Sequence, residues 1–126
     1  MDKKRILLID DEVDFIKILK CNLEKTDKYE VRMENEGLQG IIAAKEFKPD
    51  VILLDVLMPD IDGGEVAFQL RNDKDTKNIP IVFLTALATK DETKSAKDDV
   101  RGRRYIAKPV DIKQLIDVIE KSICPK

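Results

Sequence analysis

Five polar side chains in this sequence lie directly after short apolar runs, and together they could form a reactive site. The runs span residues 6–9, 51–54, 81–84 and 105–107, and the residues that follow them are Asp10 with Asp11, Asp55, Thr85 and Lys108. A single Asp or Thr at such a point is common, since these residues also form turns and cap helices. Four apolar runs that each end in a chemically useful group indicate one shared site.

Three carboxylates that converge on one point repel one another, so a site built from Asp10, Asp11 and Asp55 requires a cation. The all-oxygen ligand set favours Mg²⁺, with Mn²⁺ as the alternative, over zinc or copper. An aspartate can also act as a nucleophile and form an acyl phosphate. Lys108 would then place positive charge, and Thr85 a hydrogen-bond donor, beside the phosphoryl oxygens.

The apolar runs themselves are typical of strands buried on both faces of a parallel sheet. A fifth, weaker strand is predicted over residues 29–33, where Tyr29, Val31 and Met33 alternate with polar residues. Apolar residues at helical spacing separate the strands. The predicted helical stripes are formed by Val13, Ile16, Leu19 and Leu23; by Leu38, Ile41, Ile42 and Lys45; by residues 65–70; and by Ile112, Leu115, Ile116, Ile119 and Ile123, with Asp111 as the cap of the last helix.

Strands that alternate with helices predict a single α/β domain over residues 1–126, a doubly wound five-stranded parallel sheet with helices on both faces. In such a sheet the ligand site lies at the carboxyl ends of the strands, which is where the five polar side chains fall. One segment fits this pattern poorly, because Ala96 is the sole apolar residue between positions 89 and 99. We expect that segment to be mobile or available to a partner.

Composition excludes several other kinds of site. The chain has no histidine, which removes Ser-His-Asp and Cys-His nucleophilic sites and most zinc sites. Its five glycines form neither a P-loop nor a dinucleotide-binding fingerprint. The stretch Asp60-Ile61-Asp62-Gly63 resembles part of an EF-hand, but the strong calcium positions of that loop would be Met58 and Gln69, so it is excluded. A net charge of −2 gives no general reason to bind nucleic acid or an anionic membrane.

Nothing in the sequence directs the chain to a membrane or out of the cell. No apolar stretch approaches the length of a membrane span. The start, Met1-Asp2-Lys3-Lys4-Arg5, leads into four apolar residues and then two aspartates, which is not the pattern of a signal peptide. We therefore expect a cytoplasmic protein.

Four stretches resemble the motifs of the receiver domain of two-component response regulators, in the order of that family and along the whole chain. The most specific is Leu54-Asp55-Val56-Leu57-Met58-Pro59-Asp60-Ile61-Asp62-Gly63. The others are Leu7-Leu8-Ile9-Asp10-Asp11-Glu12, Leu84-Thr85-Ala86 and Tyr105-Ile106-Ala107-Lys108-Pro109. The resemblance implies a flavodoxin-like sheet with the strand order 2-1-3-4-5.

The resemblance also implies a role for each matching residue. Asp55 would accept a phosphoryl group, whose oxygens Thr85 and Lys108 would bind. Thr85 and Tyr105 would change orientation together on activation, and the peptide bond between Lys108 and Pro109 would be cis. The implied metal ligands are Asp10, Asp11, Asp55 and the backbone carbonyl of Leu57.

On this basis we expect a phospho-acceptor module of a two-component phosphorelay. Its donor would be a histidine kinase or a histidine phosphotransfer protein, and a downstream protein of unknown identity would read the switched surface. The chain would not be an enzyme beyond catalysing its own phosphorylation and dephosphorylation. No nucleic acid or membrane partner is expected for this domain.

Three other interpretations are open for this fold and charge pattern. A flavin-binding module would need a hydroxyl-rich phosphate loop after the first strand, where Asp10 and Asp11 would repel the phosphate. A receiver fold that binds partners without phosphorylation would be marked by loss of Asp55, Lys108 or the acidic pair, and none is lost. A metal-dependent phosphatase would need a further general acid and a cap domain, for which the chain has no room. Phosphorylation by a small phosphodonor in the presence of Mg²⁺ separates these alternatives.

Overall fold

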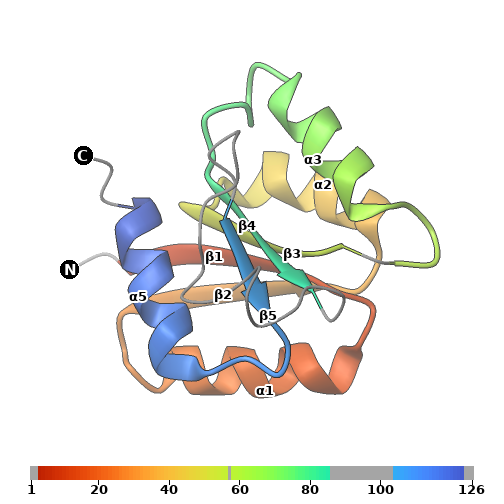
Figure 1. Cartoon of the computed structure of the whole chain (residues 1–126). Coiled ribbons are helices and arrows are strands. Elements are labelled where there is room, and N and C mark those ends of the chain that lie inside the picture. The colour runs from red at the N-terminus through yellow and green to blue at the C-terminus, as the bar shows by residue number, and fades with distance from the viewer. Residues whose placement is uncertain (1–2, 57, 86–103, 124–126) are drawn as a thin grey trace.

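Five parallel strands form the centre of the molecule, in the order β2-β1-β3-β4-β5 (Figure 1). The computed structural model describes residues 3–56, 58–85 and 104–123. Its elements, in chain order, are β1 (Lys4–Ile9), α1 (Val13–Glu24), β2 (Tyr29–Glu34), α2 (Gly37–Phe47), β3 (Val51–Asp55), α3 (Gly63–Arg71), β4 (Ile81–Thr85), β5 (Arg104–Ala107) and α5 (Ile112–Ile123). The predicted parallel sheet, its strand order and the alternation of strands with helices as far as β4 are confirmed; residues 86–103, between β4 and β5, lie outside the described ranges.

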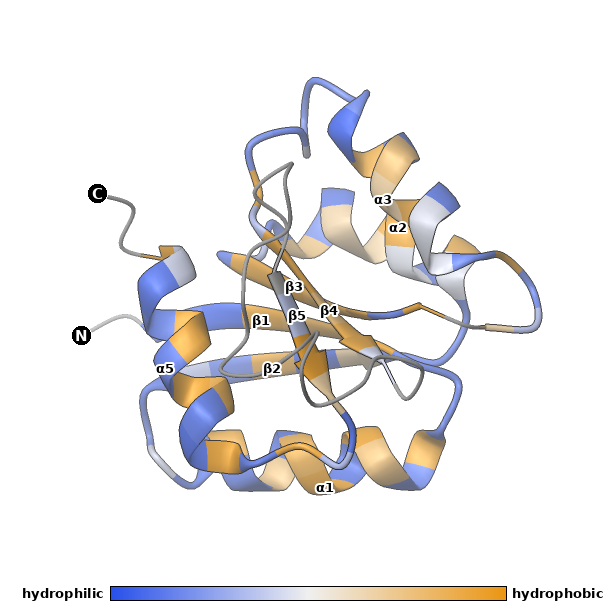
Figure 2. Ribbon diagram, in the orientation of Figure 1, coloured by the Kyte–Doolittle hydropathy of each residue, from blue (hydrophilic) through white to orange (hydrophobic). Residues whose placement is uncertain are grey.

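The central strands are buried on both faces, as their unbroken apolar runs predict. Every residue of β3 and β4 is buried, and so is β1 from Ile6 onward, and these strands are coloured largely as hydrophobic in Figure 2. Successive side chains of a strand point to opposite faces, so Ile6 and Leu8 enter one core while Leu7 and Ile9 enter another. Each fully buried Leu or Ile contributes roughly 1.5–3 kcal/mol before the loss of chain entropy. Because both faces are packed, the sheet holds the residues at the ends of its strands in fixed positions.

In the described part of the chain, two pairs of helices cover the sheet, one pair on each face (Figure 1). Helices α1 and α5 pack on the core that contains Ile6 and Leu8, here named the α1–α5 core. Helices α2 and α3 pack on the core that contains Leu7 and Ile9, here named the α2–α3 core. The predicted stripe of α1 is confirmed at Ile16, Leu19 and Leu23 but not at Val13, which is exposed. The predicted stripe of α5 packs on the α1–α5 core, and Val118, which was not predicted, is buried with it.

The cap predicted for the last helix is also present. Asp111 Oδ1 accepts the backbone N–H of Lys113 at 2.9 Å and that of Gln114 at 3.4 Å. These are N–H groups of the first turn of α5, which have no partner inside the helix. The side chain therefore sets the point at which the chain turns from β5 into α5.

The predicted apolar stripe of α2 is wrong at Leu38 and Ile42, although Ile41 packs partly on the α2–α3 core. Leu38 and Ile42 are 51% and 48% exposed. The buried face of α2 is formed instead by Gly37, Gly40, Ala43 and Ala44. A Cβ atom at Gly40 would lie 2.5 Å from Cδ1 of Ile9, so the helix approaches β1 too closely for a larger side chain. Packing distance, rather than hydrophobicity, decides which face of α2 is buried.

The carboxyl ends of four strands meet at one edge of the sheet. The residues paired there are Ile9 with Leu54, Asp55 with Leu84, and Thr85 with Ala107. Because the strands are parallel and in register, the residues that follow them are brought together. This is the edge at which the sequence places its five polar side chains.

Two predictions concern residues outside the described ranges, namely the backbone ligand at Leu57 and the segment 89–99. Within the described ranges, no helix is both long enough and apolar enough to cross a membrane.

Candidate functional site

Asp10 and Asp11 follow directly from β1, which ends at Ile9. The backbone N–H of Asp10 donates to the carbonyl of Glu34 at 3.1 Å, so β2 fixes the point where the chain leaves the sheet. The side chain of Asp10 is fully buried, and its Oδ1 accepts the backbone N–H of Glu12 at 3.0 Å. Asp11 is exposed. The acidic pair therefore presents one carboxylate inside the site and one at its mouth.

Asp55 is the last residue of β3 and is 5% exposed. Carboxylate oxygens of Asp10, Asp11 and Asp55 all lie within 4.8 Å of one another. The backbone beside Asp55 is tightly packed, because a Cβ atom at Gly63 would lie 2.2 Å from the Asp55 carbonyl oxygen. The predicted convergence of three carboxylates is thus present, and the adjoining backbone holds it in place.

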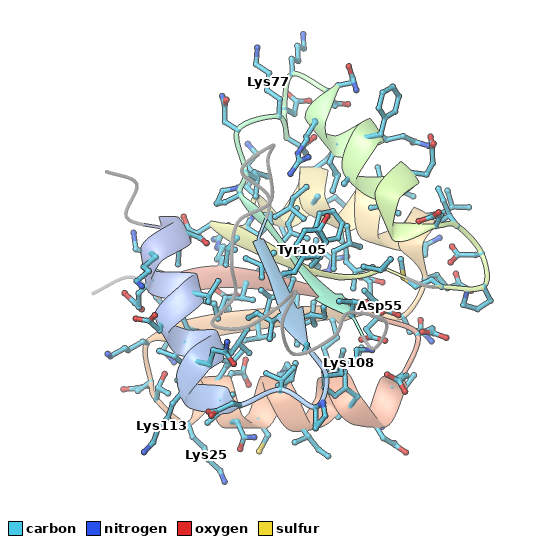
Figure 3. All side chains as sticks on the ribbon, viewed as in Figure 1. Lys25, Asp55, Lys77, Tyr105, Lys108 and Lys113 are labelled. Atoms are coloured by element: carbon cyan, nitrogen blue, oxygen red, sulfur yellow. The ribbon has the colours of Figure 1, made fainter. Side chains whose placement is uncertain are left out.

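Lys108 reaches the site from the end of β5. Its ammonium nitrogen Nζ lies 2.8 Å from Asp10 Oδ2 and 3.4 Å from Asp55 Oδ1. Figure 3 shows Lys108 and Asp55 at the same end of the sheet. The peptide bond between Lys108 and Pro109 is cis, as the family resemblance implies. The predicted cation is therefore in contact with two of the three carboxylates.

Two further residues surround Lys108 and received no role from the sequence. Glu12 Oε1 lies 2.6 Å from Lys108 Nζ, and the ring of Phe15 lies below the ammonium group with its centroid 4.7 Å away. Glu12 belongs to the acidic stretch after the first strand, so its charge was an available signal. Phe15 offered no such signal, because its cation–π contact depends on where α1 lies against the end of β5.

Burial is the main electrostatic influence on the carboxylates. It raises the pKa of Asp10, against the opposing effect of Lys108. It also raises the pKa of Asp55 to about 7, and the charge of Asp10 adds to this effect. For Lys108, burial acts to lower the pKa, but the contacts with Asp10 and Glu12 outweigh it and the pKa is raised. The lysine is therefore charged at neutral pH, while ionisation of the buried carboxyl groups of Asp10 and Asp55 costs free energy.

The donor set fits a hard divalent cation such as Mg²⁺. All three side chains of the cluster offer carboxylate oxygens. Asp10 Oδ2 is buried and forms a 2.8 Å ion pair with Lys108 Nζ, and within the described part of the chain no further group donates a hydrogen bond to it. A cation would give that oxygen a second partner and offset the excess of negative charge. The fourth predicted ligand, the carbonyl of Leu57, lies outside the described residues.

Thr85 and Tyr105 lie on the other face of the sheet from Asp55. Thr85 shares its face with Phe83, two residues earlier, which belongs to the α2–α3 core. Tyr105 pairs with Phe83, and their rings stack with centroids 5.2 Å apart. Asp55 shares its face with Leu53, which belongs to the α1–α5 core. The predicted acceptor therefore lies on one face of the sheet and the predicted switch residues on the other, at the same end of neighbouring strands.

Asp60 and Asp62, which were excluded as part of an EF-hand, bind the starts of helices. Asp62 Oδ1 accepts the backbone N–H of Gly64 at 2.7 Å and caps α3. The two oxygens of Asp60 accept the backbone N–H groups of Gly37 and Leu38, at the start of α2. Both carboxylates are thus occupied by backbone donors, which agrees with the exclusion of a calcium loop.

Comparisons with known proteins match this chain along most of its length. Residues 6–120 match the family model of the response regulator receiver domain. Protein PilH of Pseudomonas aeruginosa is 37% identical over 120 residues, which cover 91% of this chain and 93% of PilH. The DNA-binding dual master transcriptional regulator RpaA of Synechocystis sp. is 35% identical over 112 residues, which cover 89% of this chain and 46% of RpaA. The chain therefore spans nearly all of one relative and about half of the other.

The solved structures agree with the sequence comparisons. The chemotaxis protein CheY4 of Vibrio cholerae has a TM-score of 0.81 to this chain at 25% sequence identity, and the match covers 96% of this chain and 99% of CheY4. The residues matched by the family model include the whole site, from Asp10 to Lys108. The chain belongs to the response regulator receiver domain family.

Proposed function

We propose that this chain accepts a phosphoryl group on Asp55 and signals this state to a partner protein in a two-component phosphorelay. The observation that carries the proposal is the position of Asp55. Its carboxylate lies within 4.8 Å of oxygens of Asp10 and Asp11 and 3.4 Å from the ammonium group of Lys108. A carboxylate between a metal-ligand set and a cation is placed to act as a nucleophile toward phosphorus. Membership of the receiver domain family supports the same assignment.

In this proposal Asp10, Asp11 and Asp55 bind Mg²⁺, with Mn²⁺ as the alternative, and the carbonyl of Leu57 is a further ligand. When bound, the ion supplies positive charge that stabilises the ionised carboxylates and the phosphoryl oxygens. Asp10 is the buried member of the set and Asp11 the exposed one. The exposed position of Asp11 leaves the site accessible to the ion and to a phosphodonor.

The transfer itself is a displacement at phosphorus. One oxygen of Asp55 forms a bond to the phosphorus atom, and the bond to the donor's leaving group breaks, with its electron pair going to the donor. Asp55 must be ionised for this step, and burial raises the pKa of Asp55 to about 7. Lys108 can balance charge on the phosphoryl oxygens because its Nζ lies 3.4 Å from Asp55 Oδ1. We assign to Thr85 a hydrogen bond to another phosphoryl oxygen, and to Tyr105 a change of orientation that follows it.

The proposed phosphodonor is a histidine kinase or a histidine phosphotransfer protein, and the proposed target is a downstream protein that recognises the phosphorylated surface. The chain would catalyse its own phosphorylation and dephosphorylation and no other reaction. A flavin-binding role is less well supported by the site, because Asp10 and Asp11 stand at the end of β1, where they would repel a flavin phosphate.

Incubation with acetyl phosphate and Mg²⁺, followed by intact-mass measurement, tests the proposal. We expect one added phosphoryl group, which hydroxylamine removes and which EDTA prevents. Asp55→Asn should stay unlabelled, while Asp117→Asn, on the exposed side of α5, should be labelled like the parent. Full labelling of Asp55→Asn, or a phosphate carried by Ser or Thr, would contradict the proposed function.

A further inference from the structure

Asp60 lies in the connection between β3 and α3, and its side chain binds the start of α2. Its Oδ1 accepts the backbone N–H of Gly37 and its Oδ2 accepts that of Leu38, each at 3.1 Å. These are the first two residues of α2, and the residue before them, Glu36, provides no side-chain cap. Although burial acts to raise it, the pKa of Asp60 is lowered, because these N–H groups stabilise the carboxylate. Asp60 therefore supplies from a distant segment the capping that a preceding residue usually provides.

The packing beside Asp60 brings this segment into direct contact with α2. A Cβ atom at Gly37 would lie 2.2 Å from Cγ2 of Ile61, 3.0 Å from Cγ2 of Val66 and 3.3 Å from Cε of Met58. The absence of a side chain at Gly37 thus lets the helix touch the chain on both sides of Asp60. Hydrogen bonds and close packing act on the same contact, so α2 and this segment are held in one relative position.

The same segment leads out of the acidic site. It begins directly after Asp55 and runs to α3, as the connection between β3 and α3 in Figure 1. Its two ends are joined, because the N–H of Gly63 donates to the carbonyl of Val56 at 2.8 Å. Residues 58–62 form the far side of this closed loop, and Asp60 anchors them to α2. The loop is thus held at its base by Gly63 and at its far side by Asp60.

We propose that Asp60 is a positioning residue for the metal site. It is not part of the acidic cluster, but it fixes the loop that begins at Asp55. The inference rests on the proposed function, in which Asp55, directly before this loop, binds the ion. A loop that is already held in place loses less conformational freedom when the ion binds, so metal affinity depends on Asp60. By linkage, metal binding steadies the start of α2 in return.

Calorimetric titration with Mg²⁺ alone tests this dependence in the parent chain and in three variants. Asp73→Ala is the matched control, because Asp73 also joins α2 to another segment, through a 2.9 Å ion pair with Lys45, but at the other end of the helix. We expect Asp60→Ala to weaken Mg²⁺ binding by about tenfold. Asp60→Asn should weaken it less, because it keeps one acceptor oxygen, and Asp73→Ala should stay within about twofold of the parent.

Amide hydrogen exchange gives a second readout that requires no variant. In the parent chain Mg²⁺ should slow exchange of the Gly37 and Leu38 amides, the two donors to Asp60. Asp60→Ala should lose this response. If Asp60 served only the stability of the fold, Mg²⁺ would not change the exchange rates of these two amides.

The outcomes separate this inference from the proposed function. Three results would overturn the inference and leave the proposed function intact: equal Mg²⁺ affinity in the parent and Asp60→Ala, equal losses in Asp60→Ala and Asp73→Ala, or exchange at Gly37 and Leu38 that does not respond to Mg²⁺. A parent chain that binds no Mg²⁺ would overturn both.

Discussion

Replacing Asp55 with Asn should stabilise the metal-free protein at neutral pH, although it removes the proposed phosphorylation site. The carboxylate of Asp55 is 5% exposed and lies beside that of Asp10. Burial, and secondly this like charge, raise the pKa of Asp55 from 3.8 to about 7. Between these two pH values the folded state keeps a proton on Asp55 that the unfolded chain has lost. The free energy of unfolding should therefore fall as the pH rises through that range.

The size of the effect follows from the same shift. The difference between about 7 and 3.8 is about 3 pH units, which corresponds to roughly 4 kcal/mol at 1.36 kcal/mol per unit. This is an upper bound, because Lys108 loses one of its three carboxylate partners in the variant. We therefore expect Asp55→Asn to raise the free energy of unfolding by about 1–4 kcal/mol at about pH 7.5. At about pH 4 the carboxyl is neutral in the folded state and about half neutral in the unfolded chain, so the difference should fall below about 1 kcal/mol.

Urea unfolding of the parent and Asp55→Asn in EDTA, at about pH 4 and about pH 7.5, measures both quantities. In thermal unfolding each kcal/mol should appear as roughly 3–5 °C for a chain of this length. Asp117→Asn, on the exposed side of α5, is the matched control and should change stability by less than about 0.5 kcal/mol. Added Mg²⁺ should stabilise the parent more than Asp55→Asn, since the ion binds the folded state through the carboxylate.

Two results would refute this reasoning. Equal stability of the parent and Asp55→Asn at about pH 7.5 would show that the ion pair with Lys108 fully offsets the burial of Asp55. A stabilisation of the same size at about pH 4 would show that the gain comes from the packing of Asn rather than from the lost charge.

Three further variants test other parts of the structure. Asp11→Ala should weaken Mg²⁺ binding far more than Asp117→Ala, because only Asp11 belongs to the acidic cluster; equal binding by the two variants would place the ion elsewhere. Gly63→Ala should lower the free energy of unfolding by about 1–3 kcal/mol, because its Cβ would lie 2.2 Å from the backbone oxygen of Asp55; a urea midpoint equal to that of the parent would contradict this close approach. Tyr29→Phe should cost about 1 kcal/mol, because the hydroxyl of the buried Tyr29 donates to Glu120 and joins β2 to α5; an unchanged free energy of unfolding would mean that water serves Glu120 equally well.

The amino-acid sequence alone was sufficient to predict the strands and the residues at their ends. An unbroken apolar run of three or four residues, as at 6–9 or 105–107, is consistent with a strand buried on both faces, and the pattern lies within the run itself. The carboxyl ends of parallel strands share one edge, so Asp10, Asp55, Thr85 and Lys108 could be placed together before any contact was known. Their proximity is a consequence of topology, and topology is encoded in the alternation of strand and helix patterns.

The buried face of α2 was decided only by the tertiary structure. Helical spacing placed Leu38 and Ile42 on the stripe predicted for the core, yet both are about half exposed. The sequence also contains a second stripe of small residues on α2, and it is this stripe that faces β1, with Gly40 against Ile9. Helical spacing in the sequence identifies the faces of a helix but not how closely the helix approaches the sheet. Because α2 lies very close to β1, only the face with small residues fits against the sheet.

The contacts around the site were likewise decided by the tertiary structure. Glu12 meets Lys108, which is 96 positions away in the chain, and Asp60 caps α2, whose start is 23 positions earlier. Neither contact leaves a periodic pattern, because each depends on where two separate elements stop and how closely they approach. The sequence therefore shows which polar residues stand at the ends of the strands. The residues that orient them, such as Glu12 and Asp60, are found only in the folded structure, because their contacts depend on how the side chains of separate elements pack together.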